Sequence, residues 1–405
     1  MRKTLFTVKN YLPDATLSKY MKVSVRADEN IFVKVSLNKE LLVERFLRED
    51  EVLDAVFELI DGKNILQIEG ENLEGNKYVL KKGIRYLEKP FAIVDQNYAG
   101  RDKDIINDIV FCKSLKSLSE ILGKENSSYK AVFIRNGTYR EKVNIDSSKV
   151  MLIGEDRHKT IVTYSLAAGL PGENGGILST SNTATFTISG EDFVVENITF
   201  ENSFDRNIPI EHRQAVAVKA LADRLMFFNC AFKSTQDTLY ADFGRQYYYK
   251  CYIEGDVDFI FGAATAVFEE CVICSLDRED RKIKGYVTAA STKPDNRYGF
   301  LFIRCKLISK IKEKGCVYLG RPWHPSSDPQ RWVNVVFKEC YLDEHIHPDG
   351  WCEMHGFCPE NERFFEYRNF GPGSSKQNPK RPQLDEIEAE RYTKENILKE
   401  WKVEI

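Results

Sequence analysis

The sequence has no apolar run that approaches about 18 residues, the length that a membrane-spanning helix needs, so we expect no membrane segment. It also has no excess of charge of one sign, because 58 Lys and Arg residues face 61 Asp and Glu residues and leave a formal net charge of −3. A protein that neutralises many phosphates would be basic, so we expect no nucleic acid partner. Balanced charge does not exclude small acidic substrates, since a few cations can hold one carboxylate at a time.

A secretory signal is also missing. Residues 1–11 begin with basic side chains, but Lys9 and Asn10 interrupt the place where an apolar core would follow. We therefore expect a cytoplasmic protein without an obligate protein partner, or a secreted one if the sequence is a trimmed mature form. In the cytoplasm the ten cysteines would be mostly reduced and would pack as small buried side chains.

The pattern of apolar and polar residues changes near residue 90. Residues 22–26 and 32–37 alternate apolar and polar side chains and predict half-buried strands, whereas residues 47–60 fit either a helix or two further strands. We interpret residues 1–90 as a small β-rich accessory domain of unknown role. Residues 91–405 hold many short apolar runs and one short amphipathic segment over 114–122, which predicts an all-β domain that ends in a short helical tail.

An internal repeat indicates the architecture of this second domain. A cysteine recurs with apolar neighbours at spacings of 21, 20, 34 and 35 residues, at Cys230, Cys251, Cys271, Cys305 and Cys340. Asn197, in an earlier segment of similar pattern, takes the place of the cysteine. Short β-runs that repeat at about 20 residues indicate stacked rungs of three strands, and the fold that fits is a right-handed parallel β-helix with the cysteines in an internal ladder.

Zinc binding is the competing interpretation of the cysteines. Cys271 and Cys274 are two residues apart, and Cys352, His355 and Cys358 lie close together in the sequence. The ladder already uses Cys271, and the spacing of the others is not standard for a zinc site. We therefore expect no metal and no other cofactor.

The repeat also predicts which acidic residues stack. Asp237 and Asp258 each follow a ladder cysteine by seven residues, so they should lie one rung apart on the same face. Gln236 precedes Asp237, and Gln214 lies 22 residues before Gln236, which is again about one rung. Two amides and two carboxylates from three adjacent rungs should therefore converge on one patch.

The chemistry of this patch has several interpretations. An isolated Asp in a β protein usually caps a turn, but two stacked carboxylates raise one pKa strongly, which suits an acid and a nucleophile. Two carboxylates alone would fit a retaining glycosidase. The two amides favour an oxyanion hole, which acyl transfer needs, and no G-x-S-x-G motif offers a serine nucleophile. Carboxylate-based ester hydrolysis is the reaction that remains.

Over about residues 92–405 the sequence resembles the pectin methylesterases (pectinesterases). Six blocks match that family in order: 137–141, 214–218, 236–240, 258–262, 319–323 and 366–373. The resemblance implies a metal-free hydrolysis of the C6 methyl esters of galacturonosyl residues, in methyl-esterified homogalacturonan or oligogalacturonides, with release of methanol. It does not extend to residues 1–90, and Arg213 and residues 288–291 depart from the family's usual pattern.

The resemblance also implies a role for each catalytic residue. Asp258 would be the nucleophile, and Asp237 would act as general acid and then as general base. Gln214 and Gln236 would stabilise the oxyanion, and Arg321 would orient Asp258.

Four further residues match substrate-binding positions of the family: Thr180, Tyr240, Phe261 and Trp323. Three of them are aromatic, and aromatic faces stack on the apolar faces of sugar rings. The alternatives are a non-catalytic polysaccharide-binding β-helix, a lyase or glycosidase of polyuronates on the same fold, and a hydrolase of another acyl group or thioester.

Overall fold

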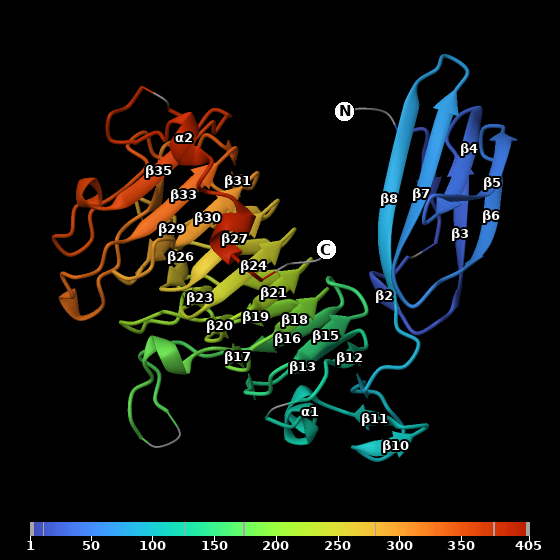
Figure 1. Cartoon of the computed structure of the whole chain (residues 1–405), viewed down its shortest axis with the longest axis horizontal. Coiled ribbons are helices and arrows are strands. Elements are labelled where there is room, and N and C mark those ends of the chain that lie inside the picture. Colours follow the sequence, from blue (N-terminus) through green and yellow to red (C-terminus); the bar gives the residue numbers. More distant parts are fainter. Residues whose placement is uncertain are drawn as a thin grey trace.

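The computed structural model describes residues 4–10, 12–124, 126–172, 175–279, 281–375 and 377–401. Residues 1–3, at the start of the segment that was considered as a signal, and 402–405, at the end of the predicted tail, lie outside the described residues. The chain forms a small unit of two β-sheets followed by a long coil of stacked rungs (Figure 1). No helix in the described part of the chain is long and apolar enough to cross a membrane.

The N-terminal unit consists of two sheets that enclose a core of their own. The first sheet contains β1 (Phe6–Val8), β3 (Tyr20–Ala27) and β6 (Val52–Glu58). The second contains, in spatial order, β2 (Ala15–Thr16), β8 (Lys77–Tyr86), β7 (Gly62–Asn72), β4 (Ile31–Leu37) and β5 (Glu40–Leu47). Strand β6 alternates exposed and buried side chains, so the strand interpretation of residues 47–60 holds rather than the helical one.

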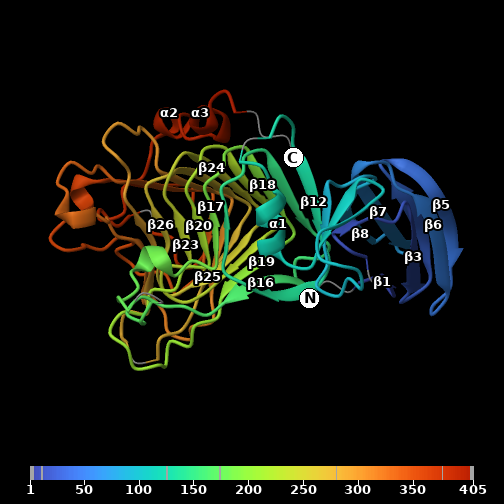
Figure 2. The ribbon, with the colours of Figure 1, turned by 90° about the horizontal axis from the view of Figure 1, so that it is seen from below.

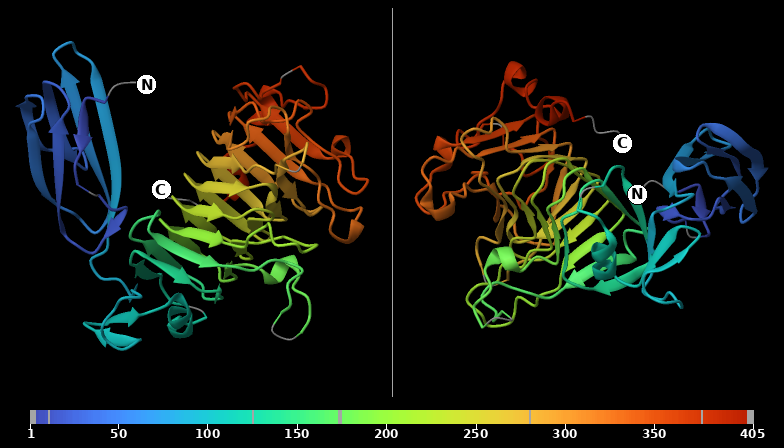
Figure 3. Two further views of the ribbon diagram at one scale, coloured as in Figure 1. Left: turned by 180° about the vertical axis from the view of Figure 1, so that it is seen from behind. Right: turned by 60° about the horizontal axis from the view of Figure 1, so that its bottom comes forward.

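The rungs of the coil form three parallel sheets, which confirms the predicted parallel β-helix (Figures 1 and 3). The twelve-stranded sheet contains β10 (Asp104–Ile106), β11 (Ile109–Cys112), β9 (Ala92–Val94), β12 (Lys130–Ile134), β15 (Val150–Gly154), β18 (Phe193–Glu196), β21 (Leu225–Phe228), β24 (Arg245–Tyr249), β27 (Thr265–Glu269), β30 (Phe300–Ile303), β33 (Asn334–Lys338) and β35 (Arg363–Tyr367). Only the pair β10 and β11 is antiparallel among the described strands of this sheet.

Two shorter sheets close each rung. The eight-stranded sheet contains β13 (Gly137–Arg140), β16 (Thr160–Tyr164), β19 (Thr199–Asn202), β22 (Ala231–Lys233), β25 (Tyr252–Gly255), β28 (Val272–Ser275), β31 (Lys306–Ser309) and β34 (Tyr341–Leu342). The seven-stranded sheet contains β14 (Val143–Ile145), β17 (Phe186–Ile188), β20 (Val218–Ala220), β23 (Leu239–Ala241), β26 (Val257–Gly262), β29 (Gly285–Ala290) and β32 (Val317–Gly320).

The five ladder cysteines lie at one position of successive rungs, directly before strands of the eight-stranded sheet. All five are buried, and each thiol donates to a backbone carbonyl of the rung before it, for example Cys271 to Tyr248 O at 3.4 Å and Cys305 to Phe268 O at 3.3 Å. The predicted internal ladder is therefore present, and all ten cysteines are free thiols.

Asn197 does not belong to this ladder. Strand β19 pairs with β22 so that Thr199 faces Ala231, which places Ile198 rather than Asn197 next to Cys230. Asn197 instead heads a column of residues with left-handed backbone, together with Asn229, Lys250, Glu270, Arg304, Glu339 and Arg368. These residues turn the chain from one sheet to the next, and Asn tolerates that conformation better than most residues, which accounts for its presence there.

Aromatic rings fill the interior beside the cysteines. Phe227, Tyr248, Phe268, Phe302 and Phe337 stack one per rung, with centroids 4.4–4.9 Å apart and interplanar angles of 10° or less. The spacing equals that of neighbouring strands, so each ring rests on the ring of the next rung. The rings come from strands of the twelve-stranded sheet and share one core with Leu239, Ile260 and Val287 of the seven-stranded sheet.

Helices cover the end and one side of the coil. Helix α1 (Leu115–Ile121) lies over the first rungs in Figure 2, and the Ser114 side chain caps it by accepting from Ser117 N at 3.0 Å. Near the C-terminus, α2 (Glu386–Ala389) and α3 (Lys394–Leu398) pack against the outer face of the twelve-stranded sheet. The short 3₁₀ turns are η1 (Thr180–Asn182), η2 (Pro325–Ser327) and η3 (Pro359–Asn361).

Candidate active site

The two predicted carboxylates lie on adjacent rungs of the seven-stranded sheet. Strand β23 pairs with β26 so that Leu239 faces Ile260, and the same offset of 21 residues separates Asp237 from Asp258. The backbone N–H of Asp237 donates to Val257 O at 3.0 Å, which fixes the two rungs together directly beside these side chains. The strand pairing therefore places Asp237 and Asp258 one rung apart, as the cysteine spacing predicts.

The backbone at both aspartates is left-handed. Asp237 has φ of 65° and Asp258 has φ of 52°, a region that costs a non-glycine residue about 1 kcal/mol or more. The pairing of β26 with β29 also shifts register between Val257 and Ile260, which is a β-bulge that contains Asp258. Bulges re-aim a side chain relative to its strand, so the irregular backbone directs this carboxylate out of the ordinary alternation of the sheet.

Arg321 holds Asp258 through two hydrogen bonds. Its Nε donates to Oδ1 at 2.8 Å and its Nη2 donates to Oδ2 at 2.6 Å, and its guanidinium lies over the Tyr286 ring with Cζ 4.0 Å from the centroid. Arg321 directly follows β32, where Gly320 passes so close to Thr288 that a Cβ would lie 2.0 Å from the threonine hydroxyl. The glycine is therefore required for the strand to bring Arg321 to this distance.

Asp237 has a different environment, although it is as buried as its neighbour, with 8% exposed against 6% for Asp258. Burial raises the pKa of Asp237 well above its usual value, and the negative charge of Asp258 raises it further. The Arg321 charge and a hydrogen bond with the Gln236 side chain oppose this rise only in part. The pKa of Asp237 is therefore raised, whereas Asp258 is paired with a fixed cation.

The two glutamines lie on neighbouring rungs beside the carboxylates. Gln214 and Gln236 form a parallel β-bridge, and Ala215 N donates to Gln236 O at 3.0 Å. Oε1 of Gln214 is buried and has no hydrogen-bond partner among the described residues, which is rare for a buried polar atom. A side-chain amide without an internal hydrogen bond can bind a ligand, because rotation about its last bond presents either an acceptor oxygen or an N–H donor.

Three aromatic side chains form one wall of the site. Tyr240 and Phe261 stack with centroids 4.3 Å apart and planes at 7°, and Trp323 lies tilted against both at 6.4 and 5.7 Å. Lys219 Nζ lies 5.7 Å from the Tyr240 centroid. The wall thus offers flat apolar faces with a cation at its edge.

All nine residues singled out from the sequence line one cavity of about 520 Å³: Thr180, Gln214, Gln236, Asp237, Tyr240, Asp258, Phe261, Arg321 and Trp323. The sequence reasoning did not identify five other lining residues, Ser179, Ser181, Ala289, Met354 and His355. The two serines flank Thr180 and could have been found from it. Met354 and His355 come from the loop after Trp351, which pairs with Gly320 at the end of β32, so only the folded chain brings them to the cavity.

His355 had been considered as part of a zinc site with Cys352 and Cys358. Cys352 is half-buried, Cys358 is exposed, and His355 faces the cavity. In the described ranges no three His, Cys, Asp or Glu side chains are grouped to hold a metal ion.

Comparisons with known proteins agree with this geometry. The family model for pectinesterase matches residues 111–400. Pectinesterase A of Dickeya chrysanthemi is 33% identical over 328 residues, which cover 71% of this chain and 88% of that protein. Pectinesterase 31 of Arabidopsis thaliana is 39% identical over 260 residues, which cover 62% of this chain and 76% of that protein. The crystal structure of a pectin methylesterase in complex with a hexasaccharide superimposes with a TM-score of 0.72 at 30% identity, over 78% of this chain and 99% of that one.

The family match extends over most of the coil and includes every residue of the cavity, whereas strands β1 to β8 lie outside it. The resemblance inferred from six sequence blocks is confirmed, and the chain belongs to the pectinesterase family.

Proposed function

We propose that this pectin methylesterase, a carboxylic ester hydrolase, uses Asp258 as its nucleophile and Asp237 as its general acid and base. The observation that carries the proposal is the contrast between the two neighbouring carboxylates, since Arg321 binds both oxygens of Asp258 while burial raises the pKa of Asp237. A carboxylate bound to a guanidinium, beside a carboxyl group of raised pKa, matches what a nucleophile and an acid require at the same pH.

In the first half of the reaction an Asp258 oxygen attacks the ester carbonyl carbon of a galacturonosyl unit. The carbonyl π electrons move to oxygen, and the amide N–H groups of Gln214 and Gln236 donate to this oxyanion. As the intermediate collapses, the bond to the methoxy oxygen breaks and Asp237 transfers its proton to that oxygen. Methanol leaves, and the acyl group remains bound to Asp258 as an anhydride.

In the second half a water molecule replaces methanol. Asp237, now a carboxylate, removes a proton from the water while the water oxygen attacks the acyl carbon. Collapse of the second tetrahedral intermediate releases Asp258 as a carboxylate and leaves the free acid of the sugar. Asp237 is protonated again, so the site returns to its starting state without any cofactor in these steps.

The substrate is proposed to be methyl-esterified homogalacturonan or its oligosaccharides. A similar pectin methylesterase, 30% identical, has been solved with a bound hexasaccharide, which supports an extended sugar ligand for this fold. Tyr240, Phe261 and Trp323 supply the faces on which sugar rings can stack, and Thr180 lines the same cavity. The comparisons do not support the expected cytoplasmic location, which forms no part of this proposal.

The proposal is tested by Asp258→Asn, which keeps the shape of the side chain and removes its charge. Methanol release from methylated pectin and from a fully methylated trimer should fall by a factor on the order of 10⁴ or more, because no other group replaces the nucleophile. Asp146→Asn, an exposed aspartate just after β14, serves as the matched control and should keep wild-type rates.

Two results would contradict the assignment. Retention of more than about a tenth of the activity by Asp258→Asn would exclude Asp258 as the nucleophile. Absence of methanol release by the wild-type protein on both substrates would favour the alternative of a polysaccharide-binding β-helix. Circular dichroism of both variants confirms that the fold is intact.

A further inference from the structure

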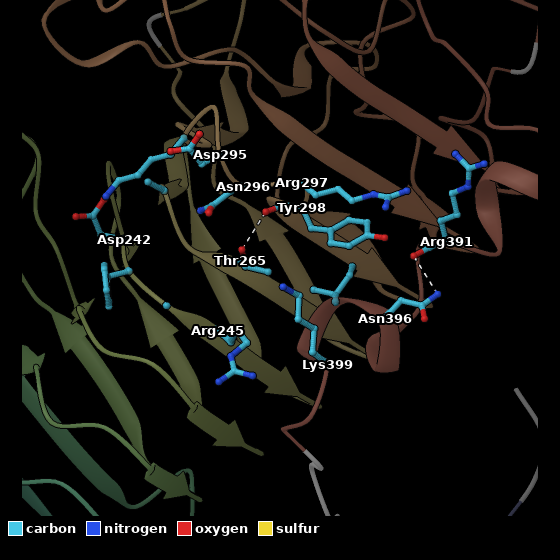
Figure 4. Close-up of a pocket in the computed structure, with 15 residues that line it drawn as sticks. Asp242, Arg245, Thr265, Asp295, Asn296, Arg297, Tyr298, Arg391, Asn396 and Lys399 are labelled. Atoms are coloured by element: carbon cyan, nitrogen blue, oxygen red, sulfur yellow. Dashed lines mark hydrogen bonds between the residues drawn. The ribbon is translucent and has the colours of Figure 1, made fainter.

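A second cavity, of about 720 Å³, opens beside the candidate active site. The loops that leave β23, β26 and β29 line it through Asp242, Ala263 and Lys293. The C-terminal segment lines its other side through Arg391, Asn396 and Lys399 (Figure 4). The same three strands carry Tyr240, Phe261 and Ala289 into the catalytic cavity. Tyr240 and Asp242 are two residues apart, at most about 7 Å along the backbone, so the two openings are neighbours.

Positive charge dominates the lining of this cavity. Its lining includes five cationic residues, Arg245, Lys293, Arg297, Arg391 and Lys399, and two acidic ones, Asp242 and Asp295. Arg245 is held by Asp223 at 2.6 and 3.0 Å and binds Leu398 O at 3.0 Å, so it fixes α3 to the coil. Among the described residues, Lys293, Arg297, Arg391 and Lys399 form no ion pair.

Aromatic rings lie among these cations. Phe243 is 51% exposed, and Lys293 Nζ lies 5.9 Å from its ring centroid. The guanidinium carbon of Arg297 lies 5.4 Å from the Tyr298 centroid. A uronic acid residue combines an apolar ring face with a carboxylate, and a cation beside an exposed aromatic ring matches both features.

We propose that this cavity binds a de-esterified stretch of galacturonan through its free carboxylates. The choice of a uronate rests on the proposed function, because each turnover converts one neutral ester into one carboxylate. The four cations that form no ion pair with any described residue favour such an anionic segment over the methylated one, which carries no charge. A polymer that has already been hydrolysed in part is then held at the second cavity while an esterified unit occupies the catalytic cavity.

Binding of a fully de-esterified oligogalacturonate to the full-length protein tests this inference. Isothermal titration calorimetry should give a dissociation constant at least about ten-fold higher for Lys293→Ala/Arg391→Ala than for the wild type. The affinity of the wild type should fall as salt is added. Arg297→Ala is a second variant that should weaken binding in the same direction. Lys116→Ala/Lys312→Ala removes the same charge from exposed positions away from the cavity and is the matched control.

Three outcomes would overturn the inference. Equal weakening by the control would indicate general attraction to net charge, and unchanged binding in the cavity variants would exclude the site. Equally tight binding of poly-L-glutamate would exclude recognition of a uronate sugar. Methanol release by the wild type from a methylated trimer reports on the catalytic cavity separately, so a failure of the proposed function is distinguished from a failure of this one.

Discussion

Asp237 and Asp258 have the same chemistry and nearly the same burial, and their surroundings make them different. Asp258 accepts two hydrogen bonds from a guanidinium, whereas the largest influence on Asp237 is the loss of water around it. The charge on Asp258 keeps a second negative charge away from Asp237. The pair is therefore interdependent, and a change in any nearby charge should appear in the acidity of Asp237.

Asp256 is the neighbour through which this acidity can be tested. Its charge also raises the pKa of Asp237, and it is itself paired with Arg206 at 2.6 Å. In the proposed mechanism acylation needs protonated Asp237, so kcat should decline as the pH rises through the pKa of Asp237. Asp256→Asn removes a negative charge, lowers that pKa, and should move the alkaline decline to lower pH by up to about one unit.

Steady-state methanol release measured across pH for both proteins checks this prediction. Asp54→Asn, which removes an exposed aspartate of the N-terminal unit, is the control and should leave the profile in place. An alkaline decline that does not move in Asp256→Asn, in a protein with normal thermal unfolding, would contradict the assignment of Asp237 as the acid.

At the level of strands, counting from the cysteines was sufficient to predict the stacking of Asp237 on Asp258. The ladder spacing of 21 residues between Cys230 and Cys251 equals the strand register between β23 and β26, because that rung contains no insertion. The β-bulge at Asp258 was not predictable in the same way. A bulge adds one residue to one strand, and nothing in the local composition distinguishes that residue from the rest of the strand.

The misplacement of Asn197 has a similar cause. In each rung with a ladder cysteine, a residue with left-handed backbone directly precedes that cysteine, whereas in the rung of Asn197 the ladder position holds Ile198. A polar side chain of cysteine size matched the pattern, although the backbone conformation determined its position. Met354 and His355 show another limit of the repeat, since they lie in an irregular loop outside the named strands and leave no periodic signal.

The aromatic stack provides a prediction about the coil. Phe268 is fully buried between Tyr248 and Phe302, with ring centroids 4.5 Å away on both sides. Phe268→Ala should lower the free energy of unfolding by about 3–5 kcal/mol, because the rungs are too rigidly paired to close the cavity left behind. Phe370→Ala, at a ring that is 57% exposed, should cost about 1 kcal/mol or less.

Denaturant titration followed by tryptophan fluorescence compares the two variants. Similar losses for both would contradict the view that the stacked interior, rather than aromatic surface in general, stabilises the rungs. Progressive unfolding of rungs would appear as a broadened transition, which is a known property of repeat architectures.

The molecule as a whole combines a family-defined coil with a unit that the family model does not cover. The N-terminal unit lies beside the first rungs and contacts the twelve-stranded sheet, where Ala15 and Leu87 pack with Ile93, Phe133 and Ile153 (Figures 1 and 2). The catalytic cavity is on the seven-stranded sheet. The contact between the two units should therefore affect stability and leave the chemistry at the cavity unchanged.

The ion pair between Arg85 and Glu196 is the test of this contact. Arg85 donates to both oxygens of Glu196, from Nε at 2.6 Å and from Nη2 at 2.7 Å, and the carboxylate is almost fully buried. Arg85→Ala leaves that charge without its partner, although Lys63 lies near enough to attract it. We expect a loss of about 2 kcal/mol in the free energy of unfolding, and recovery of part of it when Glu196→Gln is added.

Lys89→Ala is the control, because it breaks an exposed ion pair with Asp108 and should cost less than about 1 kcal/mol. Thermal unfolding and limited proteolysis between residues 87 and 91 measure the effect, and a loss in Arg85→Ala no larger than in the control would show that hydrophobic packing alone holds the two units together.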